Sequence, residues 1–135
     1  MYAIKTEVSD PQAASYNFAA VPTMYGGKHI ARGNTIYVFA SETSGGGGLI
    51  ACGVVGTAEP VPRQPGVAKQ TPRVSITVAR TALARRPLGR SELKACTDWT
   101  DGRPQTELNF KLYRQATDKI VGLSDAAAAY LATYF

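Results

Sequence analysis

The fold is decided by the stretch from Gly33 to Val61, which opens with Gly33-Asn34-Thr35-Ile36-Tyr37-Val38-Phe39-Ala40-Ser41. Successive side chains of a β-strand point to opposite faces, and this segment alternates with that period. One face would carry Ile36, Val38 and Ala40, and the other would carry Tyr37, Phe39 and Ser41. The segment therefore predicts a strand with an aliphatic face and an aromatic face.

The next apolar run, Leu49 to Val55, is continuous rather than alternating. A continuous run is typical of a central strand that is covered on both sides, and Gly53 within it indicates a bulge or a close backbone approach. The intervening segment Ser44 to Gly48 is rich in glycine, which loses more backbone freedom on folding than any other residue. We expect a mobile tip there, at the mouth of a binding site beside the aromatic face.

The remaining segments alternate strands with short helices and contain no repeat. Apolar spacing and punctuation by Pro and Gly predict the following elements. Strands are expected at Tyr2 to Glu7, Val74 to Val78 and Leu108 to Tyr113; helices at Gln12 to Ala20, Ser91 to Lys94 and Asp125 to Tyr134, the last capped by Ser124; and a long irregular loop at Pro60 to Pro72. The whole chain, 1–135, is predicted to be one α+β domain.

Positive charge is concentrated in one part of the chain. The net charge is +5 over 135 residues, yet Arg63 to Arg103 holds nine Lys or Arg against three acids. This segment fits a surface that faces phosphates, and a solvated basic face without a partner remains the alternative. The two cysteines lack the spacing of a metal or redox motif, and we find neither a signal peptide nor an apolar run long enough to span a membrane. These features predict a soluble cytoplasmic protein.

Motifs for catalysis and metal binding are missing from the sequence. The one histidine, His29, has no partner serine in a G-x-S-x-G motif, and there is no zinc spacing or phosphate-binding loop. Cys52 lies in an apolar strand, as expected of a small core residue. We therefore expect no catalytic residue, no metal and no cofactor.

Several short motifs together resemble the EVE family of PUA-like barrels. The family's opening aromatic-x-x-Lys-Ser/Thr-Glu pattern falls on Tyr2, Lys5, Thr6 and Glu7, and its strand ending in aromatic-x-Ser falls on Phe39 and Ser41. The family's Arg-Asn-Tyr signature is absent, and Tyr16-Asn17-Phe18 stands loosely in its place. The resemblance covers nearly the whole chain and implies an open, twisted barrel with flanking helices. It also implies recognition of nucleic acid, notably of a modified base in a pocket.

A base taken out of its stack needs an aromatic face and donors or acceptors for its edge. The candidates for these roles follow from the residue types. Stacking platforms are Phe39, Tyr16 and Trp99; hydrogen-bonding groups are Ser41, Thr6 and Asn17; and phosphate contacts are Lys5, Arg80, Arg85, Arg86 and Arg90. Each also has a structural interpretation: Phe39 as core, Trp99 as a loop anchor and the arginines as solvated charge.

The sequence leaves three functional hypotheses. The first is a DNA- or RNA-binding domain that reads a modified base without catalysis. The second is a small hydrolase or transferase on a related barrel, with Lys5 or Glu7 and His29 in its cleft, which is an analogy at the level of the fold. The third is a protein-interaction module that uses the Pro60 to Pro72 loop. The choice of DNA or RNA, the modification and the oligomeric state stay open.

Overall fold

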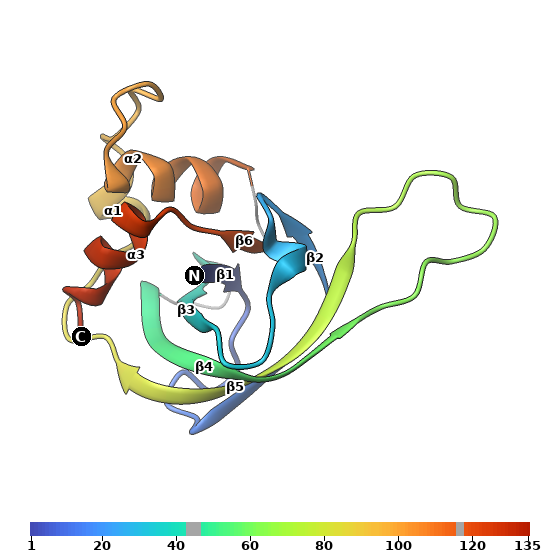
Figure 1. Ribbon diagram of the computed structural model, residues 1–135. Coiled ribbons are helices and arrows are strands. Elements are labelled where there is room, and N and C mark those ends of the chain that lie inside the picture. The colour runs from blue at the N-terminus through green and yellow to red at the C-terminus, as the bar shows by residue number, and fades with distance from the viewer. Residues whose placement is uncertain (43–46, 116–117) are drawn as a thin grey trace.

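A closed barrel forms the body of the protein in the computed structural model, which describes residues 1–42, 47–115 and 118–135 (Figure 1). Its strands follow one another around the barrel in the order β1-β3-β4-β5-β2-β6. Their bounds are β1 Tyr2–Thr6, β2 Ser15–Met24, β3 Thr35–Ala40, β4 Gly48–Pro60, β5 Arg73–Leu83 and β6 Ile120–Gly122. The pairs β1–β3 and β2–β6 are parallel, and the others are antiparallel.

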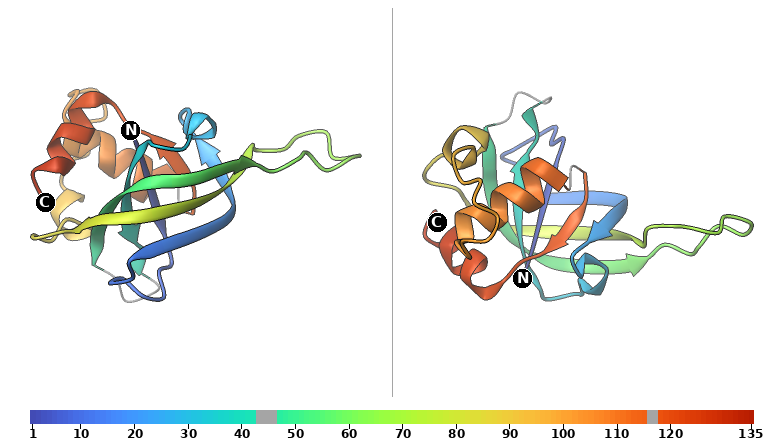
Figure 2. Two further views of the ribbon diagram at one scale, coloured as in Figure 1. Left: turned by 60° about the horizontal axis from the view of Figure 1, so that its bottom comes forward. Right: turned by 90° about the horizontal axis from the view of Figure 1, so that it is seen from above.

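Short helices gather on one side of the barrel, and the connection between β4 and β5 projects from the opposite side (Figures 1 and 2). The helices that cover the barrel are α1 Arg90–Leu93, α2 Pro104–Leu108, the π-helix η3 Asn109–Gln115 and α3 Asp125–Ala132. A separate 3₁₀ turn, η1 Gly27–His29, follows β2. In the described part of the chain no helix is long and apolar enough to cross a membrane.

Strand β3 separates two hydrophobic clusters, as its alternation predicts. Ile36, Val38 and Ala40 belong to the cluster inside the barrel, together with Ile4, Val55, Ile76 and Val78. Tyr37 and Phe39 belong to a second cluster beneath the helices, which includes Leu93, Leu108, Leu112 and Leu131. Both faces of β3 are therefore buried, and the aromatic face contacts helices rather than solvent.

The prediction that β4 is covered on both sides holds for the first half of its apolar run, where Leu49 and Cys52 pack in the cluster beneath the helices, and is wrong at Val54. Burial alternates along β4: Ala51 and Val55 face the barrel interior, whereas Ile50 is half-buried and Val54 is 38% exposed. The prediction for Gly53 is confirmed, because a Cβ there would lie 2.6 Å from the Ala79 carbonyl oxygen and the β4–β5 register shifts beside it. The barrel has helices over only part of its outer surface, so the continuous run does not imply a second cover.

The helix predicted at Gln12 to Ala20 is wrong, because this segment contributes most of β2. Tyr16 pairs with Val78 and Phe18 with Ile76, so the two rings join the barrel's apolar cluster while Asn17 points outward. Local helix propensity is weaker than the gain from completing a barrel, since β5 would otherwise have an unpaired edge.

The strand predicted at Leu108 to Tyr113 is also wrong. Pro104 occupies the start of α2, a position where its missing N–H costs nothing, and η3 continues from Leu108 without a break. Leu108 and Leu112, four residues apart, are fully buried, as is expected of one helical face. The alternation of Leu108, Phe110 and Leu112 is thus an incidental match to the period of a strand.

Other local predictions are confirmed. The strands predicted at Tyr2 to Glu7 and at Val74 to Val78 correspond to β1 and to part of β5, and the helical turn predicted at Ser91 to Lys94 corresponds to α1. The Ser124 hydroxyl accepts a hydrogen bond of 3.1 Å from the Ala127 amide at the start of α3, and Ala127 and Ala128 pack in the core. Cys52 and Cys96 are free, but the prediction that Cys52 is a core residue is not confirmed, because it is only half-buried against the cluster beneath the helices. In the glycine-rich segment, Gly47 and Gly48 are described, and residues 43–46 lie outside the described part of the chain.

Candidate nucleic-acid interface

The ends of β1 and β3 bring four of the predicted site residues together. In the parallel register Lys5 lies opposite Phe39 and Thr6 opposite Ala40, and the Ser41 amide donates a 2.9 Å hydrogen bond to the Thr6 carbonyl oxygen. Glu42 follows Ser41, and Tyr113 of η3 approaches from the helical layer. We call Lys5, Thr6, Ser41, Glu42 and Tyr113 the Lys5 cluster.

Lys5 carries its amino group into a nearly dry environment. Lys5 is 3% exposed, and its Nζ lies 3.9 Å from Glu42 Oε2 and 4.4 Å from the centroid of the Tyr113 ring. Burial lowers the pKa of Lys5, an effect that the Glu42 carboxylate opposes and the Arg90 charge reinforces. A cation here is held by one carboxylate and one aromatic face.

Tyr113 is the functional candidate that the sequence reasoning missed. Its hydroxyl is buried and has no hydrogen-bond partner in the described part of the chain. Burial raises the pKa of Tyr113 strongly, and the charges of Glu42 and Glu92 add to the effect, so the phenol keeps its proton. Tyr113 follows the buried Asn109 by four residues, and residues four apart share a helical face. Had the segment been predicted as a helix, this spacing would have indicated that Tyr113 faces inward.

Phe39 is not available as a stacking platform in this structure. It is fully buried in the cluster beneath the helices, with Leu49, Leu93 and Leu112 among the other members. The prediction that a base stacks on Phe39 is therefore wrong in this structure. The helical layer covers the aromatic face of β3, and the Phe39 ring packs against it. Ser41 is also buried, at 5% exposure.

Tyr16 and Asn17 lie on a different part of the barrel. Both are on β2, which pairs with β5 and β6 rather than with β1 or β3. The Tyr16 ring is buried and stacks on Phe18 at 6.0 Å, and its hydroxyl donates a 2.9 Å hydrogen bond to the Pro11 carbonyl oxygen. Asn17 is exposed. The structure does not bring either residue into the Lys5 cluster.

Trp99 lies in the segment between α1 and α2, against the helical layer. Its ring is 37% exposed and lies 5.4 Å from Phe110, with the Arg114 guanidinium 4.7 Å from its centroid. A small hollow of about 230 Å³ opens beside it, lined also by Arg103 and Lys111. Trp99 is thus an exposed aromatic that anchors its loop, apart from the residues of the Lys5 cluster.

The four predicted phosphate-binding arginines do not act as one surface. The Arg80 Nε donates a 2.7 Å hydrogen bond to the Ala13 carbonyl oxygen, and the Arg86 guanidinium bonds to the Thr133 carbonyl oxygen at 2.9 Å and lies 4.1 Å from the Tyr134 ring. Arg85 and Arg90 are exposed. Two of the four guanidinium groups therefore tie the chain together.

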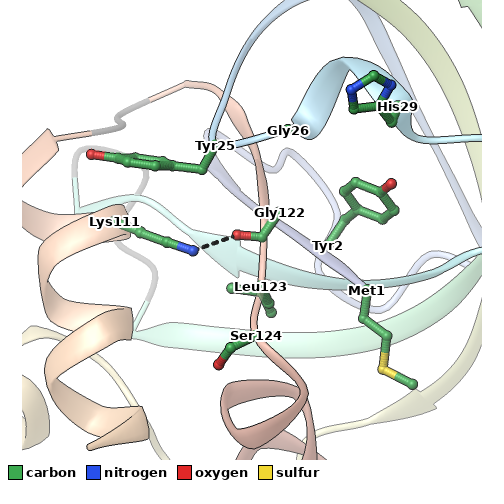
Figure 3. A pocket seen from close by; sticks show the side chains of 9 residues that line it. All are labelled: Met1, Tyr2, Tyr25, Gly26, His29, Lys111, Gly122, Leu123 and Ser124. Carbon is green, nitrogen blue, oxygen red and sulfur yellow. Dashed lines mark hydrogen bonds between the residues drawn. The ribbon is translucent and has the colours of Figure 1, made fainter. Parts of the chain in front are cut away.

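A shallow hollow of about 380 Å³ lies at the other end of β1 (Figure 3). Tyr2, Tyr25 and His29 contribute rings to its lining, and Lys111 Nζ donates a 2.8 Å hydrogen bond to the Gly122 carbonyl oxygen. His29 therefore belongs with Met1 and Tyr2, whereas Lys5 and Thr6 end the strand. The hydrolase hypothesis required His29 beside Lys5 or Glu7, and the structure does not bring these groups together.

Glu107 fixes the helical layer above this hollow. Its carboxylate accepts hydrogen bonds from the Ser124 amide at 2.9 Å, from the Ser124 hydroxyl, and from Lys111 Nζ at 3.1 Å. Burial alone would raise the pKa of Glu107, but these three hydrogen bonds outweigh burial and hold the pKa below its usual value. Across the described ranges, no group of three or more His, Cys, Asp or Glu residues could hold a metal ion.

The closed mixed barrel with helices on one side is a PUA-like α+β fold. The chain is similar to the DUF55 domain of human thymocyte nuclear protein 1, with a TM-score of 0.66 and 16% identity over 98% of this chain and 96% of that one. It is similar to human THYN1 protein in complex with DNA containing 5-methylcytosine, with a TM-score of 0.64 and 14% identity over 98% and 95%. A Pseudomonas syringae protein aligns with a TM-score of 0.60 and 17% identity over 99% of both chains.

These structural likenesses confirm the PUA-like barrel that the resemblance to the EVE family implies. The expectation that the barrel is open is wrong, because β6 pairs with both β1 and β2 and closes it. The sequence matches no protein-family model and no curated protein. At identities of 12–17%, the structural neighbours define the fold, and the function has to be argued from the site.

Proposed function

We propose that this protein binds nucleic acid and holds a modified base at the Lys5 cluster, without catalysing a reaction. The observation that carries the proposal is the buried Tyr113 hydroxyl, which has no partner among the described residues, on a ring whose centroid lies 4.4 Å from the buried amino group of Lys5. Buried polar groups are almost always hydrogen-bonded, and an unpaired one costs about 1–3 kcal/mol. A ligand atom that pairs with the hydroxyl would remove this cost.

The chemistry of the cluster suits the edge of a base. Because its pKa is raised, the Tyr113 phenol remains a neutral donor, and it can face a carbonyl oxygen or ring nitrogen. Lys5 adds a donor, and the Glu42 carboxylate adds an acceptor that fits an exocyclic amino group. Low local polarity strengthens each of these contacts. Such a site distinguishes bases by their edges.

The structural likeness supports the same proposal. Human THYN1 protein was solved with DNA that contains 5-methylcytosine, and its fold superposes on 98% of this chain. Cytosine presents an exocyclic amino donor beside a ring nitrogen and a carbonyl oxygen, which complements the carboxylate, amine and phenol of the Lys5 cluster. We use 5-methylcytosine as the probe, because the 12–17% identities of the neighbours do not carry the modification over to this chain.

The test compares affinities for two DNA duplexes that differ by one methyl group, one with 5-methylcytosine and one with cytosine. Tyr113→Phe removes a hydroxyl that has no partner in the described structure, so the variant is expected to fold normally. If the hydroxyl reads the base, the variant should lose about 2- to 12-fold in affinity for the modified duplex, the worth of one hydrogen bond. The affinity for the unmodified duplex should change less.

Tyr130→Phe is the matched control, since it makes the same chemical change at a hydroxyl that bonds to Tyr134 2.8 Å away. It should leave the ratio of the two affinities unchanged. The proposal fails if Tyr113→Phe keeps the wild-type ratio, or if the wild-type protein binds both duplexes equally. Lys5→Met provides a second test, because it removes a donor from the cluster and should lower the same ratio.

A further inference from the structure

Residues 61–72 project from the barrel as an arm between β4 and β5 (Figure 2). A groove of about 980 Å³ runs between this arm and the nearby ends of the barrel strands. Five cations line it, and no carboxylate does: Lys28, Arg63, Lys69, Arg73 and Lys119. We call this surface the basic groove.

The five cations come from four separate parts of the chain. Lys28 belongs to η1, Arg63 and Lys69 to the arm, and Arg73 to the start of β5, while Lys119 precedes β6. Closure of the barrel is what assembles them, and no single segment carries the whole group. Four of them are exposed, and Lys119 is half-buried. The two acids nearest to these cations along the chain, Asp118 beside Lys119 and Glu59 before the arm, are not among the lining residues.

The arm is held in shape by its own hydrogen bonds. The Gln70 side chain receives a 2.9 Å bond from the Gln64 amide and donates to the carbonyl oxygens of Gln64 and Val67 at 2.8 and 2.9 Å. The Arg63 guanidinium donates to the Ala68 carbonyl oxygen at 3.0 Å. These contacts fix the loop before any partner binds, which reduces the entropy cost of binding.

The base of the arm is tied to the barrel. The Thr23 amide and hydroxyl donate to the Pro72 carbonyl oxygen at 3.0 and 2.8 Å, and Arg73 donates to the Ala20 carbonyl oxygen at 3.0 Å. The amide of Val61 extends the β4–β5 ladder by a 2.9 Å bond to the Arg73 carbonyl oxygen. The groove therefore keeps one wall on the barrel and one wall on the arm.

We infer that the basic groove binds the sugar–phosphate backbone of the nucleic acid whose base occupies the Lys5 cluster. The inference rests on the proposed function and adds a second, sequence-independent contact to it. A groove with cations and no carboxylate attracts a polyanion, and phosphate contacts by Lys and Arg fix the position of a nucleic acid without reading its sequence. The groove supplies the phosphate contacts that the sequence assigned to Arg80, Arg85, Arg86 and Arg90, of which Arg80 and Arg86 are engaged within the protein.

The test uses Lys28→Ala with Lys69→Ala, at two exposed lysines that make no described hydrogen bond and line the groove from opposite sides. Each lost phosphate contact should reduce the slope of log affinity against log salt by about 0.9 for duplex DNA, so the double variant should lose about 1.8. At about 0.1 M salt this corresponds to roughly 60-fold weaker binding as an upper limit. Duplexes with and without 5-methylcytosine should lose affinity by the same factor.

Arg32→Ala with Lys94→Ala is the matched control, because it removes the same charge at exposed positions outside the groove. It should change the slope by much less than the groove variant. Equal effects of the two double variants would overturn the inference, since they would reflect net charge alone. An unchanged slope in the groove variant would also overturn it.

The outcomes separate the inference from the proposed function. A groove variant that weakens both duplexes equally supports the groove, even if the wild-type protein fails to distinguish the methylated duplex. Normal discrimination in the wild type, combined with a groove variant of unchanged affinity, overturns the groove alone. The affinity for an RNA duplex of the same sequence, compared with that for the DNA duplex, shows whether the groove binds the phosphates of DNA or of RNA. Competition by poly-glutamate as strong as that by nucleic acid would overturn the inference, because it would indicate a partner with acidic side chains.

Discussion

The two ends of this molecule differ in whether carboxylates accompany their cations. At the helix-covered end, charged groups are engaged within the protein: Lys111 pairs with Glu107, Lys5 lies beside Glu42, and Arg86 covers Tyr134. At the arm end, five cations line one groove and no carboxylate joins them. A count of basic residues along the sequence therefore does not locate a binding surface, because many of the arginines in the basic segment stabilise the fold.

The largest expected difference between the two ends concerns stability. Val78 is 1% exposed inside the barrel, and Val67 is 46% exposed on the arm. Val78→Asp should lower the free energy of unfolding by about 3–5 kcal/mol, because an unpaired charge would enter the core. Val67→Asp should change it by less than about 0.5 kcal/mol. Urea denaturation of both variants makes the measurement, and similar losses would mean that the arm is part of the core.

The carboxylate of Glu107 should be the next largest contributor. Glu107→Gln is expected to cost about 1.5–3 kcal/mol at neutral pH, because the ionised group accepts three hydrogen bonds. Since the pKa of Glu107 is held below its ordinary value, the advantage of the wild type should be present above pH 4.5 and decline as the pH falls through the lowered pKa. Denaturation curves at neutral and acidic pH check this, and a difference that does not change with pH would contradict it.

Arg80 and Lys69 sharpen the comparison between structural and solvent-facing cations. Arg80→Ala removes a charged donor from the Ala13 carbonyl oxygen and should destabilise the protein by about 1 kcal/mol. Lys69→Ala should leave stability unchanged within about 0.5 kcal/mol. Thermal melts distinguish the two. In nucleic-acid binding the order should reverse, with the larger loss for Lys69→Ala.

The smallest expected effect is the pH dependence that Lys5 contributes. Because the pKa of Lys5 is lowered in the folded protein, the unfolded chain binds more protons just below the ordinary value of 10.5. The unfolding free energy of the wild type relative to Lys5→Met should therefore rise with pH as the pH approaches 10.5 from below. Ionisation of tyrosines in the unfolded state is common to both proteins. A falling difference would mean that Lys5 is stabilised as a cation.

Segments with a clear period and clear ends could be predicted from the sequence. Local geometry determines the strand at Thr35 to Ala40, the Ser124 cap and the close approach at Gly53, and the residue types at these positions indicate it directly. The errors at 12–20 and 108–113 arose where short segments matched two periods, and packing against distant partners selected between them. The sequence also did not decide whether Phe39 is buried. The alternation of side chains along the strand is the same whether helices or solvent cover the aromatic face.

The sequence by itself determined the class of the fold and the two faces of β3, since strand periodicity and the order of the motifs indicate both. Only the tertiary structure decided which cations are free and which polar groups are buried. Barrel closure brings Lys28 and Lys119 to the arm, and η3 carries Tyr113 to Lys5 across 108 positions of the sequence. Burial and charge pairing are sums over neighbours that are distant along the chain, and these neighbours are defined only when the strands pair.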